Sequence, residues 1–480
     1  MKKLVLFFGF IILSGVLLMA GGSTERSVPA GLEYEIIDGK SVTITNYNGN
    51  ATTVDIPTRI SGLPVTSIGD HAFGGDNNLT SINIPSTVTS IGDNAFDCNS
   101  LTRITVDNSN PSYISRNDVL FDKNIRTIIR YPEGMTARTY TIPSSVTSIG
   151  DSAFLGCSSL SSITIPPSVI SIGDYAFCGS SLTSITIPSS IISISDWAFY
   201  GCHNLTNITI PSSVTSIGDS AFNACSSLAS ITIPSSVNYI GGGAFYDCSS
   251  LTNITIPSLV IHIGVSTFEN CRSLTSITIP STVTYIGAFA FNKCRSLTSI
   301  TIPSSVSSIG ECAFSGCGSL ENIIVDNRNS SYAGIEGVLF DKDIQFLIKY
   351  PEGKTAKTYT IPSSVTFIGD DAFYVCNNLT SINIPSSVTF IGDGAFSGCG
   401  SLENITVDNR NSSYAGIEGI LFDKDIQTLI KYPEGKLERT YIIPSSVNYI
   451  GGGAFYNCDN LTSITIQHHK LKLAENQKYR

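Results

Sequence analysis

The stretch I-P-S-S-V-S-S-I-G-E-C-A-F-S-G-C-G-S-L-E-N-I, from Ile302 to Ile323, sets the pattern of the whole chain. Nearly the same phrase recurs along the sequence, and the Phe of its A-F pair (once T-F) marks thirteen repeats. These Phe residues are Phe73, Phe96, Phe154, Phe177, Phe199, Phe222, Phe245, Phe268, Phe291, Phe314, Phe373, Phe396 and Phe455. Most steps between them are 23 residues, one is 22, and three are 58 or 59. A unit this short cannot bury its own apolar face, so the period predicts stacked repeats.

The apolar positions inside one repeat indicate strands. In I-T-I-P, Ile277 and Ile279 alternate with Thr278, which is typical of a strand with one buried face. Pro280 ends that strand because it lacks a backbone donor. Val283 and Ile286 are then the next inward residues, on a short second extended segment.

The rest of the repeat predicts a corner and a plug. Gly287 is expected to permit a turn, and in most repeats an Asp follows this glycine. An Asp ahead of x-A-F predicts the N-cap of a single helical turn. The marker Phe is expected to fill the interior. The Asp residues in question are Asp70, Asp93, Asp151, Asp174, Asp196, Asp219, Asp370 and Asp393.

The residues now quoted resemble a known repeat. L-x-x-I-x-I is the leucine-rich-repeat signature with Ile in place of some Leu. The full phrase I-P-S-S-V-T-S-I-G-D-x-A-F-x-x-C-x-S-L-T-S-I-T resembles the repeat of BspA-like bacterial surface proteins, the Tp-type leucine-rich repeats, over residues 33–467. The resemblance implies a mainly β repeat solenoid. This would be a leucine-rich-repeat superhelix with one parallel strand sheet and short second strands or helical turns on the other side.

The two ends of the chain differ from the repeats. A basic start, an apolar run and the small residues Ala20-Gly21-Gly22 predict a secretory signal peptide, with an uncleaved anchor as the alternative. Asp38-Gly39 lies between two strand-like runs, which indicates a capping hairpin. The chain therefore divides into a signal peptide at 1–22, an N-terminal cap at 23–67, a solenoid at 68–467 and a polar tail at 468–480.

The charge of the chain argues against some partners. The formal net charge is −10, and loss of Lys2 and Lys3 with the signal would make it −12. An acidic chain without a basic cluster does not predict binding to nucleic acid or to anionic membranes. After the signal, no apolar segment is long enough to span a bilayer.

Three modules of equal length interrupt the repeats, near residues 107–142, 326–361 and 408–443. We interpret each as one irregular coil, with L-I-K-Y-P in place of S-I-T-I-P and a hairpin around L-F-D-K-D-I-Q-T-L-I. The D-N-R-N-S letters fit Asx turns or, alternatively, a calcium site. The module tyrosines Tyr113, Tyr332 and Tyr414 are candidate contacts for a partner.

The thirteen cysteines follow the repeat. Ten of them lie three residues after the marker Phe, so each has two equivalent neighbours and no unique partner. We expect small buried apolar thiols, with scattered disulfides or metal as the alternatives. Neither the five histidines nor the many serines form a metal or catalytic motif, so we predict no enzyme, no cofactor and no metal site.

The outward side chains of the strands form the remaining candidate site. They make a nearly uncharged plane that either binds protein partners or only stabilises the sheet by cross-strand pairing. The candidate residues are Ser162, Thr164, Asn207, Thr209, Asn253, Thr255, Ser276, Thr278, Ser299 and Thr301. The family resemblance implies a secreted or surface adhesin for host cells, for matrix proteins such as fibronectin and fibrinogen, or for other bacteria. The alternative is a structural spacer of the envelope that binds nothing.

Overall fold

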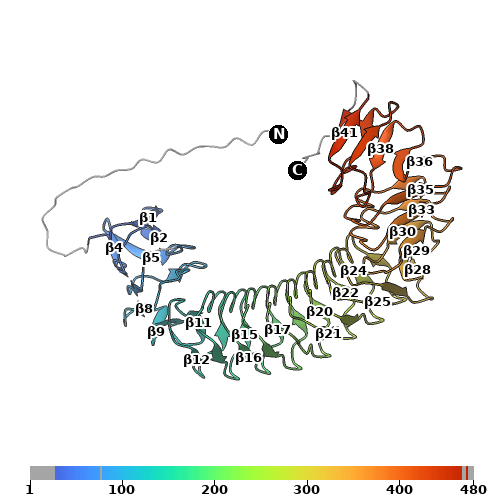
Figure 1. Ribbon diagram of the computed structural model, residues 1–480. Helices are drawn as coiled ribbons and strands as arrows, with labels where there is room; N and C mark the ends of the chain where they lie inside the picture. The colour runs from blue at the N-terminus through green and yellow to red at the C-terminus, as the bar shows by residue number, and fades with distance from the viewer. Residues whose placement is uncertain (1–26, 76–77, 468–471, 474–480) are drawn as a thin grey trace.

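The computed structural model describes residues 27–75, 78–467 and 472–473. Within these residues the chain forms strands and turns and no helix. The coils stack along a crescent (Figure 1). The signal peptide expected at residues 1–22 lies outside the described residues, and so does the tail expected at 468–480, apart from Lys472 and Leu473.

The cap begins with the predicted hairpin. Asp38 and Gly39 form its turn with φ of 50° and 65°, and the two strands on either side pair antiparallel. The second of these strands pairs parallel with β5, which joins the cap to the solenoid. The cap strands are β1 (Leu32–Ile37), β2 (Ser41–Tyr47), β4 (Arg59–Ile60) and β5 (Leu63–Ile68).

The S-I-T strands form a first parallel ladder, as the alternation predicted. Ile277 and Ile279 are buried, whereas Ser276 and Thr278 are exposed. The strands of this ladder are β3 (Thr53–Asp55), β6 (Ser81–Ile84), β8 (Arg103–Val106), β12 (Thr139–Thr141), β14 (Ser162–Thr164), β16 (Ser184–Thr186), β18 (Asn207–Thr209), β21 (Asn253–Thr255), β23 (Ser276–Thr278), β25 (Ser299–Ile302), β27 (Asn322–Val325), β31 (Thr358–Thr360), β33 (Ser381–Ile384), β35 (Asn404–Val407), β39 (Thr440–Ile443) and β41 (Ser463–Ile466).

The short segment after the I-P corner forms a second parallel ladder. Tyr285 pairs with Ser308, and Ile286 pairs with Ile309. In each two-residue strand the isoleucine points inward and the residue before it points outward. The strands of this ladder are β7 (Ser90–Ile91), β13 (Ser148–Ile149), β15 (Ser171–Ile172), β17 (Ser193–Ile194), β19 (Ser216–Ile217), β20 (Tyr239–Ile240), β22 (His262–Ile263), β24 (Tyr285–Ile286), β26 (Ser308–Ile309), β32 (Phe367–Ile368), β34 (Phe390–Ile391), β40 (Tyr449–Ile450) and β42 (Lys472–Leu473).

The predicted N-cap role of the Asp is wrong. The residue after it has a positive φ, 53° at Ser152 and 51° at Ser220, which a right-handed helix does not allow. The Asp carboxylate instead joins neighbouring coils. Oδ1 of Asp196 accepts the backbone N–H of Asp219 at 2.7 Å, and Oδ1 of Asp151 accepts that of Asp174 at 2.9 Å.

The glycine before this Asp is required by close approach rather than by its backbone angles. A Cβ on Gly218 would lie 2.7 Å from the backbone nitrogen of Asp196 and would collide with the Asp196 carboxylate. The turn expected at Gly287 is present, since the N–H of Ala290 donates to Gly287 O at 3.3 Å, but its left-handed residue is Phe289, two positions after the glycine.

The marker Phe side chains stack in the interior, as predicted. Phe268 is fully buried, with its ring centroid 5.7 Å from that of Phe245 and 5.6 Å from that of Phe291. Each three-strand insert restarts such a stack with a tyrosine. Tyr131 lies 5.4 Å from Phe154, and its N–H donates to Ala153 O just as the N–H of Phe154 donates to Ala176 O.

This register corrects the interpretation of the inserts. R-Y-P takes the place of the A-F turn and not of the first ladder, because Ile128 pairs with Ile149 of β13. T-Y-T in β12 restarts the first ladder, with Tyr140 opposite Ile163. The hairpin in the second half is confirmed: β10 (Val119–Asp122) pairs antiparallel with β11 (Thr127–Arg130), and β9 (Tyr113–Arg116) is added on its other side.

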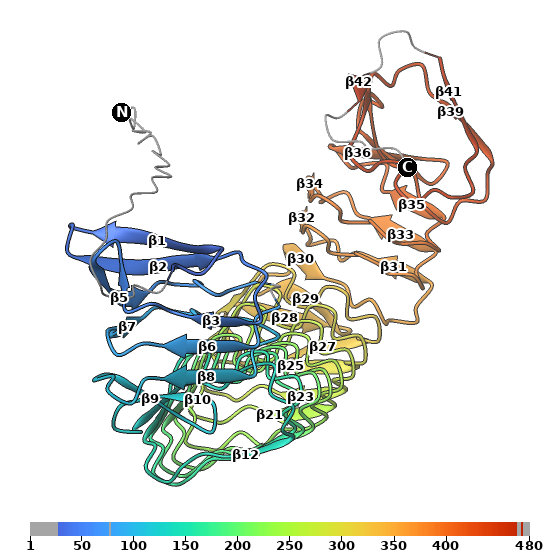
Figure 2. The same cartoon turned by 90° about the vertical axis from the view of Figure 1, so that its left-hand side faces the viewer.

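The insert strands separate the buried residues into four hydrophobic cores. The N-terminal core draws on residues 32–120, the middle core on 119–339, the third core on 338–421 and the C-terminal core on 420–454. The strands are β9 (Tyr113–Arg116), β10 (Val119–Asp122), β11 (Thr127–Arg130), β28 (Tyr332–Ile335), β29 (Val338–Asp341), β30 (Phe346–Lys349), β36 (Tyr414–Ile417), β37 (Ile420–Asp423) and β38 (Thr428–Lys431). Figure 2 shows the stack changing direction near β28–β30.

Candidate protein-binding surfaces

The ten candidate residues of the first ladder all lie on its solvent face. We call them the polar face. Every one of them is exposed, and the Ile between each pair points into the middle core. Their strands are in register, with Asn253 opposite Ser276 and Thr255 opposite Thr278. The result is a continuous surface of hydroxyl and amide groups without charge.

The polar face differs from the equivalent surface in the other blocks. There, outward side chains bond to each other: Thr105 donates to Asn83, and Asn383 Nδ2 donates to Thr360 Oγ1 at 2.9 Å. On the polar face, among the residues that the structure describes, only Asn253 makes a side-chain hydrogen bond, to Thr252 Oγ1 at 3.2 Å. Hydrogen bonds between outward side chains therefore do not tie the strands of the polar face together as they do in those other blocks.

The three insert tyrosines lie at the open edge of the second ladder. The Tyr332 hydroxyl accepts the backbone N–H of Ile309 at 2.9 Å, and the Tyr414 hydroxyl accepts that of Ile391 at 3.1 Å. The Tyr113 hydroxyl donates to Thr89 O at 3.4 Å. Burial raises the pKa of all three phenols. Their hydroxyls cover the strand end, and only part of each side chain can reach a partner.

The D-N-x-N letters of the inserts form turns around a buried asparagine. Asn329 Nδ2 donates to Pro303 O at 2.7 Å and to Val306 O at 2.9 Å, and its Oδ1 accepts the N–H groups of Ser331 and Tyr332 at 2.8 Å. Asn110 and Asn411 make the same four bonds. These Asx turns explain the letters, and the described residues contain no group of three or more His, Cys, Asp or Glu side chains that could hold a metal ion.

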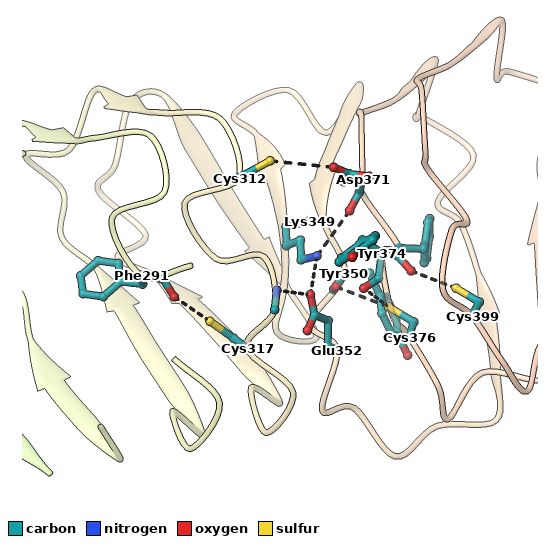
Figure 3. Close-up of polar contacts among 12 residues, drawn as sticks. Phe291, Cys312, Cys317, Lys349, Tyr350, Glu352, Asp371, Tyr374, Cys376 and Cys399 are labelled. Atoms are coloured by element: carbon teal, nitrogen blue, oxygen red, sulfur yellow. Dashed lines mark hydrogen bonds and ion pairs between the residues drawn. The ribbon is translucent and has the colours of Figure 1, made fainter. Parts of the chain in front are cut away.

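A buried ion pair lies where each insert meets the following block. Figure 3 shows the second one, in which Lys349 Nζ lies 3.1 Å from Glu352 Oε1 and 3.3 Å from Asp371 O. Glu352 Oε1 also accepts the N–H of Gly316 at 2.7 Å, which connects two coils. Burial raises the pKa of Glu352, while Lys349 opposes the shift. The corresponding pairs are Arg130–Glu133 and Lys431–Glu434.

Most of the cysteines are buried, as predicted, and none of them is joined in a disulfide. The thiol of Cys317 donates to Phe291 O at 3.0 Å and that of Cys271 to Phe245 O at 3.1 Å (Figure 3 shows the former). Burial raises the pKa of the Cys317 thiol to about 12. Cys271 and Cys317 thus serve as weak donors between coils, and the raised pKa makes each of these two thiols a poor nucleophile.

One surface went unnoticed in the sequence. The outward residue of the second-ladder strands is Ser from β7 to β19, but Tyr239, His262 and Tyr285 take that place in β20, β22 and β24. After the second insert, three phenylalanines continue the column: Phe346, Phe367 and Phe390. The letter before I-G would have revealed this change, had it been followed from repeat to repeat.

The sequence of the repeats matches one family model. The description of that family is BspA type leucine rich repeat region, and it matches residues 45–137, 133–252, 238–336, 352–429 and 434–478. The chain belongs to this family. The predicted resemblance is thereby confirmed for most of the sequence. No curated protein matches the chain in sequence.

Several solved structures of bacterial leucine-rich-repeat proteins are similar to this BspA-type chain. A leucine-rich cell surface protein from Faecalibacterium prausnitzii is 27% identical, with 91% of this chain and 93% of that one covered and a TM-score of 0.28. A leucine-rich repeat protein from Bacteroides ovatus is 24% identical, with 91% and 88% covered and a TM-score of 0.40. The leucine-rich repeat protein of T. pallidum is 24% identical, with 61% and 89% covered and a TM-score of 0.22.

The family and the fold are those of leucine-rich-repeat scaffolds. Across the described ranges, the structure contains no helix that is both long and apolar enough to cross a bilayer.

Proposed function

We propose that this BspA-type protein is a secreted or surface-associated scaffold that binds proteins through its polar face. Its partners would be host-cell or extracellular matrix proteins, such as fibronectin or fibrinogen, or the surface of other bacteria. The polar face supports this proposal because its hydroxyl and amide groups are exposed and, Asn253 excepted, make no side-chain hydrogen bond within the described chain.

The affinity would come from repetition. Each Ser, Thr or Asn side chain can replace a hydrogen bond to water with a hydrogen bond to a partner. One such exchange contributes little to the free energy of binding. Strands repeated in register present the same group many times, so many weak contacts act together across one long surface. The elongated solenoid suits this mode better than a single deep pocket would.

The test is a solid-phase binding assay with residues 23–480 on fibronectin, fibrinogen and epithelial cells. We expect saturable binding, and loss of at least about 10-fold in affinity when Thr209, Thr255 and Thr278 are replaced by Lys, since three long cations would separate the surfaces. The control carries the same three lysines at Thr215, Thr284 and Ser307, which are exposed next to the second ladder.

Binding by the control but not by the polar-face variant supports the proposal. Equal loss in both variants would mean that added charge and not the polar face matters. Absence of saturable binding to all three targets would favour the structural spacer, whose expected contribution is length and rigidity alone.

A further inference from the structure

The aromatic column on the second ladder supports a second interaction surface, on a different face from the polar face. Phe346, Phe367 and Phe390 pair in register on the adjacent strands β30, β32 and β34. Their side chains are 41%, 47% and 51% exposed, although phenylalanine usually avoids water. We call these three residues the phenylalanine stripe.

The rings of the stripe lie close together and close to the backbone. The centroids of Phe367 and Phe390 are 5.9 Å apart, with the ring planes tilted by 44°. The Phe346 ring lies over Gly369, since a Cβ there would come within 3.0 Å of Phe346 Cε2. The stripe therefore exposes ring area on three successive coils, and its first ring lies against the I-G-D corner of the next coil.

That corner carries negative charge. Asp370 and Asp393 follow the glycines of this corner and are exposed, and Asp370 Oδ1 accepts the N–H of Asp393 at 2.8 Å. Asp371 lies beside them, half-buried. The nearby cation Lys349 is buried in its pair with Glu352, so it leaves the exposed carboxylates uncompensated at the surface.

Side chains of the column can reach the Asp corner. In the middle block, the Tyr239 hydroxyl donates to Asp219 Oδ1 at 3.3 Å, which joins the aromatic column to the carboxylate of the preceding coil. Farther along, β42 pairs parallel with β40 and sets Lys472 in register with Tyr449. A lysine of the chain itself thus takes the next place in the same column.

We propose that the phenylalanine stripe, with Asp370 and Asp393, binds an extended lysine- or arginine-bearing segment of another protein. The ring faces attract a cation, and the methylene stem of Lys or Arg covers apolar ring area while its charged end meets a carboxylate. Strands in the ladder are spaced about 4.8 Å apart, which offers one ring on each of the three coils and a carboxylate on two of them, those of Phe367 and Phe390.

The probe is a fluorescein-labelled Gly-Lys-Thr-Lys-Thr-Lys-Gly peptide, and the matched peptide has Gln in place of each Lys. Fluorescence anisotropy with residues 23–480 is expected to show saturable binding of the Lys peptide, with the Gln peptide at least about 10-fold weaker. Because exposed charges are screened, binding of the Lys peptide should weaken as salt rises.

Two variants separate the rings from the charges. Replacement of Phe346, Phe367 and Phe390 by Ser copies the residue found in this column in the first half of the solenoid, so the coils should still stack. We expect at least about 10-fold weaker binding. Asp370→Asn with Asp393→Asn retains an oxygen that can accept the N–H of residue 393, and should weaken binding several-fold and flatten the salt dependence.

A gain-of-function variant guards against indirect effects of these losses. Ser171, Ser193 and Ser216 hold the same column beside Asp174, Asp196 and Asp219. The starting protein is the variant in which the three stripe phenylalanines are Ser. Replacing Ser171, Ser193 and Ser216 by Phe in that variant should restore binding of the Lys peptide. The polar-face lysine variant should bind the peptide normally, which makes failure of this proposal distinct from failure of the proposed function.

Three results would overturn the inference. Equal affinity for the Lys and Gln peptides would make the stripe an apolar docking site without charge selection. Unchanged binding after loss of the three rings would place the cation elsewhere on this acidic chain. No measurable binding of the Lys peptide by the parent protein at low salt would reject the proposal outright.

Discussion

Leu120 and Phe121 are consecutive residues of β10, yet they pack into different hydrophobic cores. Leu120 belongs to the N-terminal core, and Phe121 to the middle core. Leu339 and Phe340 separate in the same way, and so do Leu421 and Phe422. A strand sends alternate side chains to opposite faces, so the central strand of each insert is a wall with a core on either side. The inserts therefore end one block and begin the next.

The stack of rings gives the first prediction. Phe268→Ala should lower the free energy of unfolding by about 3–5 kcal/mol, because a fully buried ring leaves a cavity between two others. Urea unfolding followed by the fluorescence of the single tryptophan, Trp197, measures this loss. The exposed Thr278→Ala should stay within about 0.5 kcal/mol of the parent. A loss below about 1 kcal/mol for Phe268→Ala would show that the ring does not fill the core.

The buried insert asparagine gives the second. Asn329→Ala removes four hydrogen bonds to backbone groups, so we expect a loss of about 3 kcal/mol or more. Asn327→Ala, two residues away and exposed, is the control and should change stability by less than about 0.5 kcal/mol. Similar losses from both substitutions would contradict the role assigned to Asn329.

The thiols give a prediction for chemical labelling. Burial raises the pKa of Cys157, Cys202 and Cys317 to about 12, so these thiols should resist iodoacetamide in the native protein. The less buried Cys178, Cys312 and Cys458 should label first. In urea without reductant, mass spectrometry should find all thirteen labelled. Mostly unlabelled cysteines in the unfolded chain would instead reveal disulfides.

The first insert gives a prediction for pH. Burial raises the pKa of Glu133 to about 7, with Arg130 opposing the shift and Asp97 adding to it. The folded chain then holds this proton more tightly than the unfolded chain, whose carboxyl titrates near 4.5. Stability from this group is therefore present at low pH and is lost as pH rises from about 4.5 to about 7.

Glu133→Gln should remove that part of the pH dependence and keep a partner for Arg130. The measurement is the urea midpoint between pH 4.5 and pH 7, the window set by these two pKa values. Glu403→Gln, at an exposed position, is the control and should follow the parent. An identical pH profile for the parent and Glu133→Gln would exclude the junction as its source.

The 23-residue period of the sequence was enough to predict which positions of each repeat are buried and which are exposed. Alternation placed Ile277 inward and Thr278 outward, and repetition showed that Phe268 and Cys271 are core residues. The sequence did not predict which strands of neighbouring coils pair at the inserts. Tyr131 looked like the end of a first-ladder strand because Y-P resembles I-P, but pairing with the next coil decides its place, and that pairing leaves no mark in local letters.

The prediction for the Asp at the corner was wrong for a similar reason. Asp196 was assigned to its own coil as a helix cap, whereas its carboxylate bonds to the N–H of Asp219 in the next coil. Local propensity treats a segment alone, and here the partner of each polar group lies one coil away. The phenylalanine stripe was overlooked because a repeat was treated as a consensus, and function can lie in the positions where successive copies depart from it.

The pairing of each coil with its neighbours has a consequence for the order of folding. The N-terminal cap is synthesised first. Its strand β5 pairs with β2 inside the cap and with β7 of the first repeat. Most later strands pair with a strand about 23 residues earlier, as Ser276 does with Asn253. A chain that emerges from the ribosome N-terminus first can thus add one coil at a time to a finished template, without waiting for distant residues. The open end of such a growing stack would always be its newest coil.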